Sequence, residues 1–250
     1  MKLTDNTIFI TGGTSGIGRA LAEALHDLGN QVIISGRRQA LLDEVVGGKP
    51  GMHALRLDIA DPVDIARAAR QLTGDFPALN VVINNAGIMQ FDDAAGAVNE
   101  DMLLSTVTTN LLGPIRLAGA LMEHLKQQPT ATLVNVSSVL GFVPMAMTAV
   151  YCATKAAIHS YTMSLRWSLR NSSVSVLEIA PPWVQTDLLN SKEEPRAMPL
   201  AEFIAETIAV LGSDVQEVLV ERAKPMRANP GPNEYAFVAQ FNQALVEPAV

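Results

Sequence analysis

The sequence predicts an α/β fold with a doubly wound parallel sheet of about seven strands, helices on both faces, and a single domain spanning residues 1–250. Short apolar runs rich in β-branched residues recur along the chain, as expected for strands buried on both faces. Stretches with the three-to-four-residue apolar spacing of helices separate these runs. Such alternation is typical of right-handed βαβ units.

Composition and charge narrow the possible functions. The 250 residues are 48% hydrophobic and 17% charged, which indicates a globular chain. The net charge of −7 without a basic block argues against nucleic acid or an anionic membrane as partner. No apolar run approaches the ~18–20 residues of a membrane span, and the first residues are too polar for a signal peptide. The single cysteine, Cys152, fits a reducing compartment, so we expect a cytoplasmic protein.

The first strand, residues 7–10, runs into a glycine-rich turn, and a helix follows that ends at Gly29. Such a turn lets the backbone approach a pyrophosphate, which the free N–H groups and dipole of the helix start stabilise. The flanking strand and helix favour a dinucleotide site over a tight turn without a ligand. The candidate cofactor-binding residues here are Gly12, Thr14, Ser15, Gly16, Ile17 and Gly18.

The second strand, residues 31–35, leads to Gly36, Arg37 and Arg38. An acid at this place would bind the adenosine ribose, whereas arginine accommodates a 2′-phosphate. Arg37 and Arg38 therefore favour NADP(H) over NAD(H). The alternative is that these arginines only contact solvent.

A third strand at residues 52–57 and a fourth at residues 80–83 flank a helix at residues 61–73. Asp61 is suited to cap that helix, and Pro62 to occupy its first position. Asp58 and Ile59 follow the third strand, and Asn85, Ala86 and Gly87 follow the fourth.

A long helix is expected over residues 99–127, with Asn110 and Pro114 inside it. Proline lacks the N–H group that would bond the Asn110 carbonyl, so a kink is predicted and that carbonyl is open to a water molecule. A kink that serves packing alone is an equally good interpretation.

The central stretch combines Ser138, Tyr151 and Lys155. Ser138 follows an apolar run and should lie at the carboxyl end of a strand, where open α/β sheets bind ligands. Tyr151 and Lys155 share one face of a helix predicted over residues 151–170. An ammonium about 4 Å from the phenol would lower the phenol's pKa by roughly three units, toward the range for general acid–base catalysis. We expect a site that moves a proton on or off oxygen.

Residues 140–147 form an apolar loop beside this centre, which predicts a pocket for an apolar or aromatic carbonyl compound. A subunit contact is nearly as good an explanation of the loop. The candidate pocket residues are Leu140, Phe142, Met145, Met147 and Trp183. Residues 186–200 are polar and interrupted by proline, and we expect them to form a mobile substrate loop.

The C-terminal part should contain a strand, a helix, a short strand, a loop and a last helix. Their expected ranges are residues 174–179, 201–211, 217–220, 224–232 and 235–246. The helix at residues 151–170 carries small side chains, so another helix could approach it closely. We therefore expect a homodimer or homotetramer paired through this helix and the helix at residues 99–127.

Together these motifs resemble the short-chain dehydrogenase/reductase family over residues 5–215. The resemblance rests on Thr11-Gly12-x-x-x-Gly16-x-Gly18, Asn84-Asn85-Ala86-Gly87, Asn110, Ser138 and Tyr151-x-x-x-Lys155, in this order and at family-like spacing. It implies a Rossmann-type domain in which Tyr151 is the general acid–base and Ser138 positions the carbonyl. It further implies that Lys155 binds the nicotinamide ribose and lowers the tyrosine's pKa, and that the Asn110 backbone holds a water of a proton relay.

The resemblance also implies cofactor contacts from Asp58 and Ile59, from Asn85 to Gly87, and from Pro181, Val184 and Thr186. Two features depart from the family pattern. Pro181-Pro182 stands where the family usually has Pro-Gly, and residues 224–250 form a divergent C-terminal extension.

The function expected from these residues is hydride transfer between NADP(H) and a carbonyl or alcohol group of an apolar small molecule, without a metal. The alternative is an NADP(H)-binding regulator or redox sensor without turnover, which would be expected to have lost a catalytic side chain. An epimerase or dehydratase acting on a nucleotide sugar is disfavoured by the apolar loop at residues 140–147.

Overall fold

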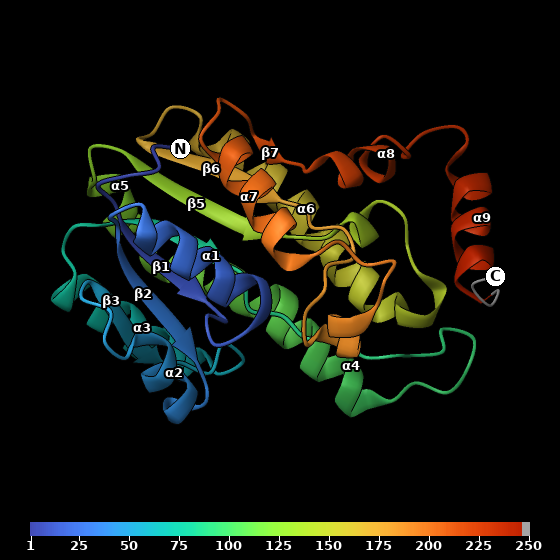
Figure 1. Ribbon diagram of the computed structural model, residues 1–250, viewed down its shortest axis with the longest axis horizontal. Coiled ribbons are helices and arrows are strands. Elements are labelled where there is room, and N and C mark those ends of the chain that lie inside the picture. The colour runs from blue at the N-terminus through green and yellow to red at the C-terminus, as the bar shows by residue number, and fades with distance from the viewer. Residues whose placement is uncertain (247–250) are drawn as a thin grey trace.

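The computed structural model describes residues 1–246, and a single parallel sheet runs through them (Figure 1). Its seven strands lie in the order β3-β2-β1-β4-β5-β6-β7. The strands are β1 (Thr7–Thr11), β2 (Gln31–Gly36), β3 (Met52–Arg56), β4 (Leu79–Asn84), β5 (Ala131–Val136), β6 (Val174–Ile179) and β7 (Glu217–Val218). Every neighbouring pair is parallel. The predicted fold class is confirmed.

Helices cover both faces of this sheet. They are α1 (Gly16–Asp27), α2 (Gln39–Val46), α3 (Pro62–Asp75), α4 (Glu100–Val107), α5 (Gly113–Gln127), α6 (Ala149–Leu169), α7 (Leu200–Leu211), α8 (Lys224–Arg227) and α9 (Glu234–Val246). Side chains of α1, α2 and α7 form one apolar core with the sheet, and side chains of α3, α5 and α6 form the other.

The alternation of side chains along each strand supplies both cores. Ile8 and Ile10 of β1 pack in the core with α1, whereas Phe9 packs in the core with α3, and all three are fully buried. This two-sided burial explains the continuous apolar runs in the sequence.

The predicted helix at residues 99–127 is interrupted in the structure. Asn99 caps α4 by accepting a hydrogen bond from the Met102 N–H group at 3.1 Å. A π-helical turn, Thr108–Leu112, separates α4 from α5, and the Gly113 N–H group bonds the Thr108 carbonyl five residues back. Pro114 lies in the first turn of α5, so the predicted break beside the proline is confirmed.

Other boundaries differ from those predicted. Helix α2 was missed, because residues 39–46 follow two arginines and have no strong cap. Helix α8 occupies part of the predicted loop at residues 224–232, and β7 is shorter than residues 217–220. The segment at residues 186–200 contains a 3-10 turn, Leu188–Glu193, in which Leu189 and Asn190 have positive φ angles.

The described part of the C-terminal extension, residues 224–246, returns to the body of the molecule. Figure 1 shows α9 at one edge, beyond the carboxyl ends of the strands. Its Phe237, Val238 and Phe241 pack against Phe142 and its neighbours, and Phe241 with Leu245 also packs against the cluster that contains Tyr151. Within residues 1–246, no helix combines the length and the apolarity that crossing a membrane requires.

Candidate active site

The glycine-rich turn between β1 and α1 packs directly on the segment that follows β4. Gly12 has φ +69°, and a β-carbon there would lie 2.9 Å from the Cα atom of Ala86. A β-carbon at Gly18 would overlap the side-chain amide of Asn85. The Asn85 amide also donates to the Thr11 carbonyl at 3.0 Å. These contacts explain the glycines at both positions and bring two candidate cofactor segments together.

The start of α1 has the features of an anion site. Ser15 is its N-cap residue but makes no side-chain capping bond, and no acidic residue lies in the first turn. The first N–H groups of the helix are therefore left for another acceptor. A β-carbon at Gly16 would lie 3.4 Å from Thr186 Cβ, so Thr186 adjoins the same helix end. Ile17 packs against the core beneath it. The residues present fit the pyrophosphate of a dinucleotide.

The ends of β2 and β3 form the neighbouring part of the site. A β-carbon at Gly36 would lie 2.9 Å from Thr14 Cγ2, so the glycine-rich turn contacts the end of β2. Arg37 and Arg38 are exposed there. Arg56, at the end of β3, donates from Nε to the Arg37 carbonyl at 3.3 Å. The sequence reasoning missed Arg56, although its place at the end of a predicted strand was the available signal.

Asp58 and Ile59 lie next to this region, where main-chain contacts hold them. Asp58 Oδ1 accepts from the Ala60 N–H group at 3.0 Å, and the Asp58 N–H group donates to Asp64 Oδ2 at 2.7 Å. Ile59 is buried, and its carbonyl lies so close to Gly113 that a β-carbon there would meet it at 2.5 Å. These contacts connect the end of β3 to the π-helical turn.

The π-helical turn places Asn110 between β4 and α6. Asn110 is 1% exposed, and its side chain bonds both the N–H group and the carbonyl of Ile88, each at 2.8 Å. Its Nδ2 atom also donates to Thr154 Oγ1 at 3.3 Å. A β-carbon at Gly87 would lie 3.4 Å from Asn110 Oδ1 and 3.7 Å from Lys155 Nζ. Gly87, Asn110 and Lys155 are thus neighbours, as the motifs predict.

Ser138, Tyr151 and Lys155 meet at the carboxyl end of β5. The Tyr151 phenol lies close enough to the Ser138 hydroxyl for that hydroxyl to influence the phenol's pKa. The Lys155 ammonium lies 5.5 Å from the centre of the Tyr151 ring and donates to the Val136 carbonyl at 2.8 Å. All three side chains are buried. The structure therefore brings together a phenol, a hydroxyl and an ammonium, which is the set needed to exchange a proton with a substrate oxygen.

The direction of the Tyr151 pKa shift was predicted wrongly. Burial raises the pKa of the phenol above its ordinary value, and the nearby Ser138 hydroxyl lowers it by less. Burial also lowers the pKa of the Lys155 ammonium to about 8, against the opposing charge of Glu178. Spacing along a helix predicted the neighbours, but it did not reveal that both groups are desolvated.

An apolar cluster surrounds the phenol. Its members are Met145, Tyr151 and Cys152, with Met89, Leu140, Leu189, Phe241 and Leu245 packed against them. Of the predicted pocket residues, Leu140 and Met145 lie here. Phe142 lies instead in a second cluster with Val143 and Ala180, and Met147 is 37% exposed. Trp183 is 38% exposed and stacks on the Arg196 guanidinium.

The segment after β6 closes the other side of the site. The Pro181 carbonyl accepts from the Val139 N–H group at 3.0 Å, directly after Ser138. Val184 is buried and forms an isolated parallel bridge with Met198. Thr186 Oγ1 accepts from the Leu188 N–H group at 3.3 Å. The contacts of Pro181 and Val184 fix the chain on both sides of Pro182, which stands where the family usually has glycine.

Comparison with known proteins agrees with this geometry. The family model described as short chain dehydrogenase matches residues 6–197. The uncharacterised oxidoreductase DltE of Bacillus subtilis (strain 168) is 38% identical over 233 residues, which cover 91% of this chain and 92% of that protein. An uncharacterised oxidoreductase of Staphylococcus aureus (strain USA300) is 30% identical over 186 residues, which cover 74% of this chain and 80% of that protein.

Solved structures show the same fold. A short chain dehydrogenase from Burkholderia cenocepacia J2315, in complex with NADP, superimposes with a TM-score of 0.85 at 24% identity, covering 99% of this chain and 100% of that one. A short-chain dehydrogenase from Streptomyces avermitilis gives 0.81 at 25% identity, covering 96% and 98%. The family match, the relatives and the site geometry together show that the chain is an oxidoreductase that belongs to the short-chain dehydrogenase/reductase family.

Proposed function

We propose that this protein is an NADP(H)-dependent carbonyl reductase or alcohol dehydrogenase of the cytoplasm, acting on an apolar small molecule. The single observation that carries the proposal is the shared burial of Ser138, Tyr151 and Lys155, with the Ser138 hydroxyl near the phenol and the Lys155 ammonium 5.5 Å from the centre of the phenol ring. Proton transfer to or from a substrate oxygen needs a positioned donor and a way to stabilise its charge, and these three groups supply both.

Each residue has a distinct task in this mechanism. The nicotinamide, when bound, supplies or accepts the hydride. Tyr151 donates the proton to the carbonyl oxygen during reduction, and Ser138 donates a second hydrogen bond to the same oxygen. Lys155 favours the phenolate that Tyr151 becomes, because a positive charge stabilises an anion strongly in a desolvated site. The burial of Tyr151 and Lys155 gives such a site.

The side chains around Tyr151 support an apolar substrate. Met89, Leu140, Met145 and Leu189 offer no charge to a ligand, and Phe241 adds an aromatic ring from α9. Apolar walls with few polar groups are typical of small-molecule sites. A ketone, aldehyde or quinone with an apolar body suits this environment better than a sugar or an acid.

The preference for NADP(H) rests on the arginines at the ends of β2 and β3. Arg37 and Arg38 are exposed, so their charges are available to a 2′-phosphate, and Arg56 contacts the backbone beside them. The structural neighbour from Burkholderia cenocepacia is in complex with NADP, which agrees with this preference.

Pairing through α4, α5 and α6 is part of the proposal. Leu104 on α4 is 55% exposed, and Met163 and Trp167 on α6 are 45% and 69% exposed. Large apolar side chains at one helix surface are typical of subunit contacts. Sedimentation equilibrium of the wild type and Trp167→Glu would test this, with a shift toward monomer expected for the variant.

A panel of carbonyl compounds offered with NADPH and with NADH, followed by nicotinamide absorbance, tests the function. We expect turnover of apolar ketones, aldehydes or quinones, faster with NADPH. Tyr151→Phe should lower kcat by at least about a hundredfold, the usual contribution of general acid–base catalysis, while cofactor binding is kept. NADPH binding without turnover of any carbonyl compound would instead favour a regulator or redox sensor.

A further inference from the structure

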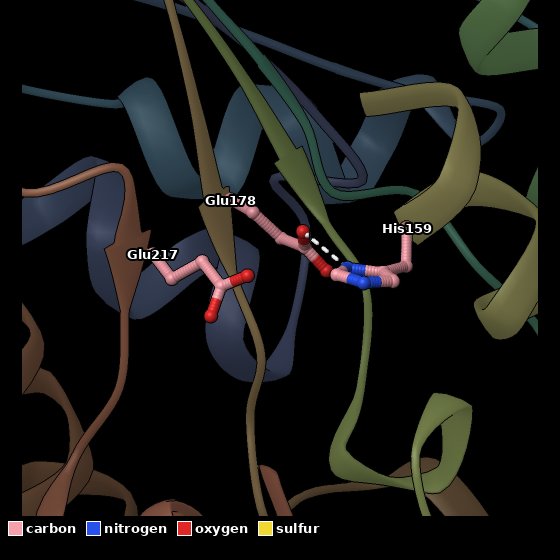
Figure 2. A group of neighbouring side chains, drawn as sticks. All are labelled: His159, Glu178 and Glu217. Atoms are coloured by element: carbon pink, nitrogen blue, oxygen red, sulfur yellow. Dashed lines mark hydrogen bonds and ion pairs between the residues drawn. The ribbon is translucent and has the colours of Figure 1, made fainter. Parts of the chain in front are cut away.

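Glu178 of β6 is a buried carboxylate directly behind the proposed site. It is 1% exposed, and its Oε2 atom accepts a hydrogen bond from His159 Nδ1 at 2.8 Å (Figure 2). Its Oε1 atom is buried and has no hydrogen-bond partner among the residues that the structure describes. An ionised carboxylate in such a place is costly unless positive charge lies nearby. The surroundings of Glu178 should therefore show where that charge is.

Helix α6 and the strand register place Lys155 next to this carboxylate. Lys155 and His159 are four residues apart on α6, so they lie on one face, one turn apart. The Lys155 ammonium donates to the carbonyl of Val136, which pairs across the sheet with Ile179, the residue after Glu178. The carboxylate, bonded to His159, thus lies within Coulombic reach of the ammonium, and its negative charge opposes the effect of burial on the Lys155 pKa.

The other charged side chains near Glu178 already have hydrogen-bond partners. Glu217 of β7 lies with His159 and Glu178 in one group of side chains (Figure 2), whose potential ligand atoms are all within 4.8 Å of one another. Both oxygens of Glu217 are bonded by the Arg227 guanidinium, at 2.7 and 2.9 Å. Arg166 donates to the Val176 carbonyl at 2.9 Å.

The ion pair between Glu217 and Arg227 distinguishes Glu217 from Glu178. Arg227 occupies the oxygens that Glu217 would offer to a metal ion, so the group is better described as an ion-pair network than as a cation site. Among the described residues no arginine is hydrogen-bonded to Glu178: Arg227 of α8 interacts with it only through space, whereas His159 of α6 is bonded to it directly. The titratable and charged groups around Lys155 and Glu178 are Tyr151, Cys152, His159, Arg166, Glu217 and Arg227.

We propose that Glu178 is a positioning residue for the reaction, whose negative charge keeps the Lys155 ammonium protonated while His159 holds the carboxylate in place. The proposal rests on the function proposed above. In water a single carboxylate would have little effect on a lysine, but inside the protein the interaction is several times stronger. Glu178 would thereby extend the range of pH over which Lys155 can stabilise the Tyr151 phenolate.

The test compares Glu178→Gln with Glu217→Gln, two neutral replacements of similar shape. In Glu178→Gln the ionisation of Lys155 should move to lower pH by about one unit, the effect of a nearby charge in a partly desolvated site. The alkaline limb of the kcat profile should move with it. In Glu217→Gln, the matched control, neither should move by more than a few tenths of a unit.

The direct readout is the NMR titration of Lys155 in the full-length protein labelled with ¹³C-lysine, assigned with Lys155→Arg. It needs no substrate, so it separates this proposal from the proposed function. Glu178→Asp keeps the charge, and it should restore at least part of the wild-type ionisation even if Glu178→Gln is poorly folded. An unchanged Lys155 titration in folded Glu178→Gln, or equal shifts in both Gln variants, would overturn the proposal.

Discussion

The Asn110 side chain holds Ile88 by both of its main-chain groups. Oδ1 accepts from the Ile88 N–H group and Nδ2 donates to the Ile88 carbonyl, both at 2.8 Å. This pair of bonds fastens the segment after β4, which carries Gly87, to the π-helical turn between α4 and α5. Both polar atoms of the Asn110 side chain are therefore engaged in hydrogen bonds within the fold. The role of its main-chain carbonyl in holding a water stays a prediction.

Replacing Asn110 with alanine should destabilise the protein by roughly 2–4 kcal/mol, because two partly buried main-chain groups of Ile88 lose their partners. Urea unfolding followed by circular dichroism would measure the loss. Asn99→Ala, which removes the exposed cap of α4, is the control and should cost about 1 kcal/mol. Equal losses in the two variants would show that the contact with Ile88 contributes no more than an ordinary helix cap.

Lys155→Met should make the stability less dependent on pH in the alkaline range. Burial lowers the pKa of Lys155 from 10.5 to about 8, so between these values the unfolded chain binds more protons than the folded one. Wild-type stability should therefore gain roughly 3 kcal/mol, relative to Lys155→Met, as the pH rises through this window. Below about pH 8 the full cost of the buried charge is present. A difference between the two proteins that stays constant with pH would contradict this account.

Arg37→Asp should weaken NADPH binding roughly ten- to a hundredfold and leave NADH binding nearly unchanged, because a charge-assisted contact to the 2′-phosphate contributes about 1.5–3 kcal/mol. Nucleotide fluorescence titrations would give both affinities. Arg70→Asp makes the same charge change at an exposed position on α3, away from the proposed pairing surface, and is the control. If both variants change the ratio of NADPH affinity to NADH affinity equally, Arg37 does not bind the 2′-phosphate.

Local patterns were sufficient to predict much of this fold. The Ile8–Ile10 run indicates a strand buried on both faces, and the glycines after it leave room for Asn85 and Ala86. Pro114 predicted a break, and the π-helical turn Thr108–Leu112 lies directly before it. Each of these features is set either by residues close together in the sequence or by the order of the parallel strands.

What the sequence could not predict depends on contacts between distant segments. The raised pKa of Tyr151 follows from burial, to which Phe241 and Leu245 of the C-terminal helix contribute by packing against its cluster. Phe142 was placed in the pocket because its loop is apolar, but it turns toward His159, with ring centres 4.9 Å apart. Glu178 was read only as part of a strand, since nothing local shows that its side chain is buried beside α6.

Phe241→Ala should selectively impair apolar substrates. Phe241 packs against the cluster that contains Tyr151, and Asn242 fixes the helix there by accepting from the Ala146 N–H group at 2.5 Å and donating to the Pro144 carbonyl at 3.0 Å. Losing the ring should lower kcat/KM for apolar ketones by about tenfold, or about 1.4 kcal/mol, and affect small polar aldehydes less.

The matched control is Tyr235→Ala, which removes an aromatic ring from the same helix at a position that is 82% exposed. Steady-state kinetics with one apolar and one polar substrate, together with NADPH affinity, would show whether Phe241 lines the substrate pocket or only stabilises the fold. The proposed pocket requires that Phe241→Ala change the ratio of kcat/KM for the two substrates while NADPH binds as in the wild type. If that ratio stays constant, or Tyr235→Ala changes it as much, then α9 does not line the substrate site.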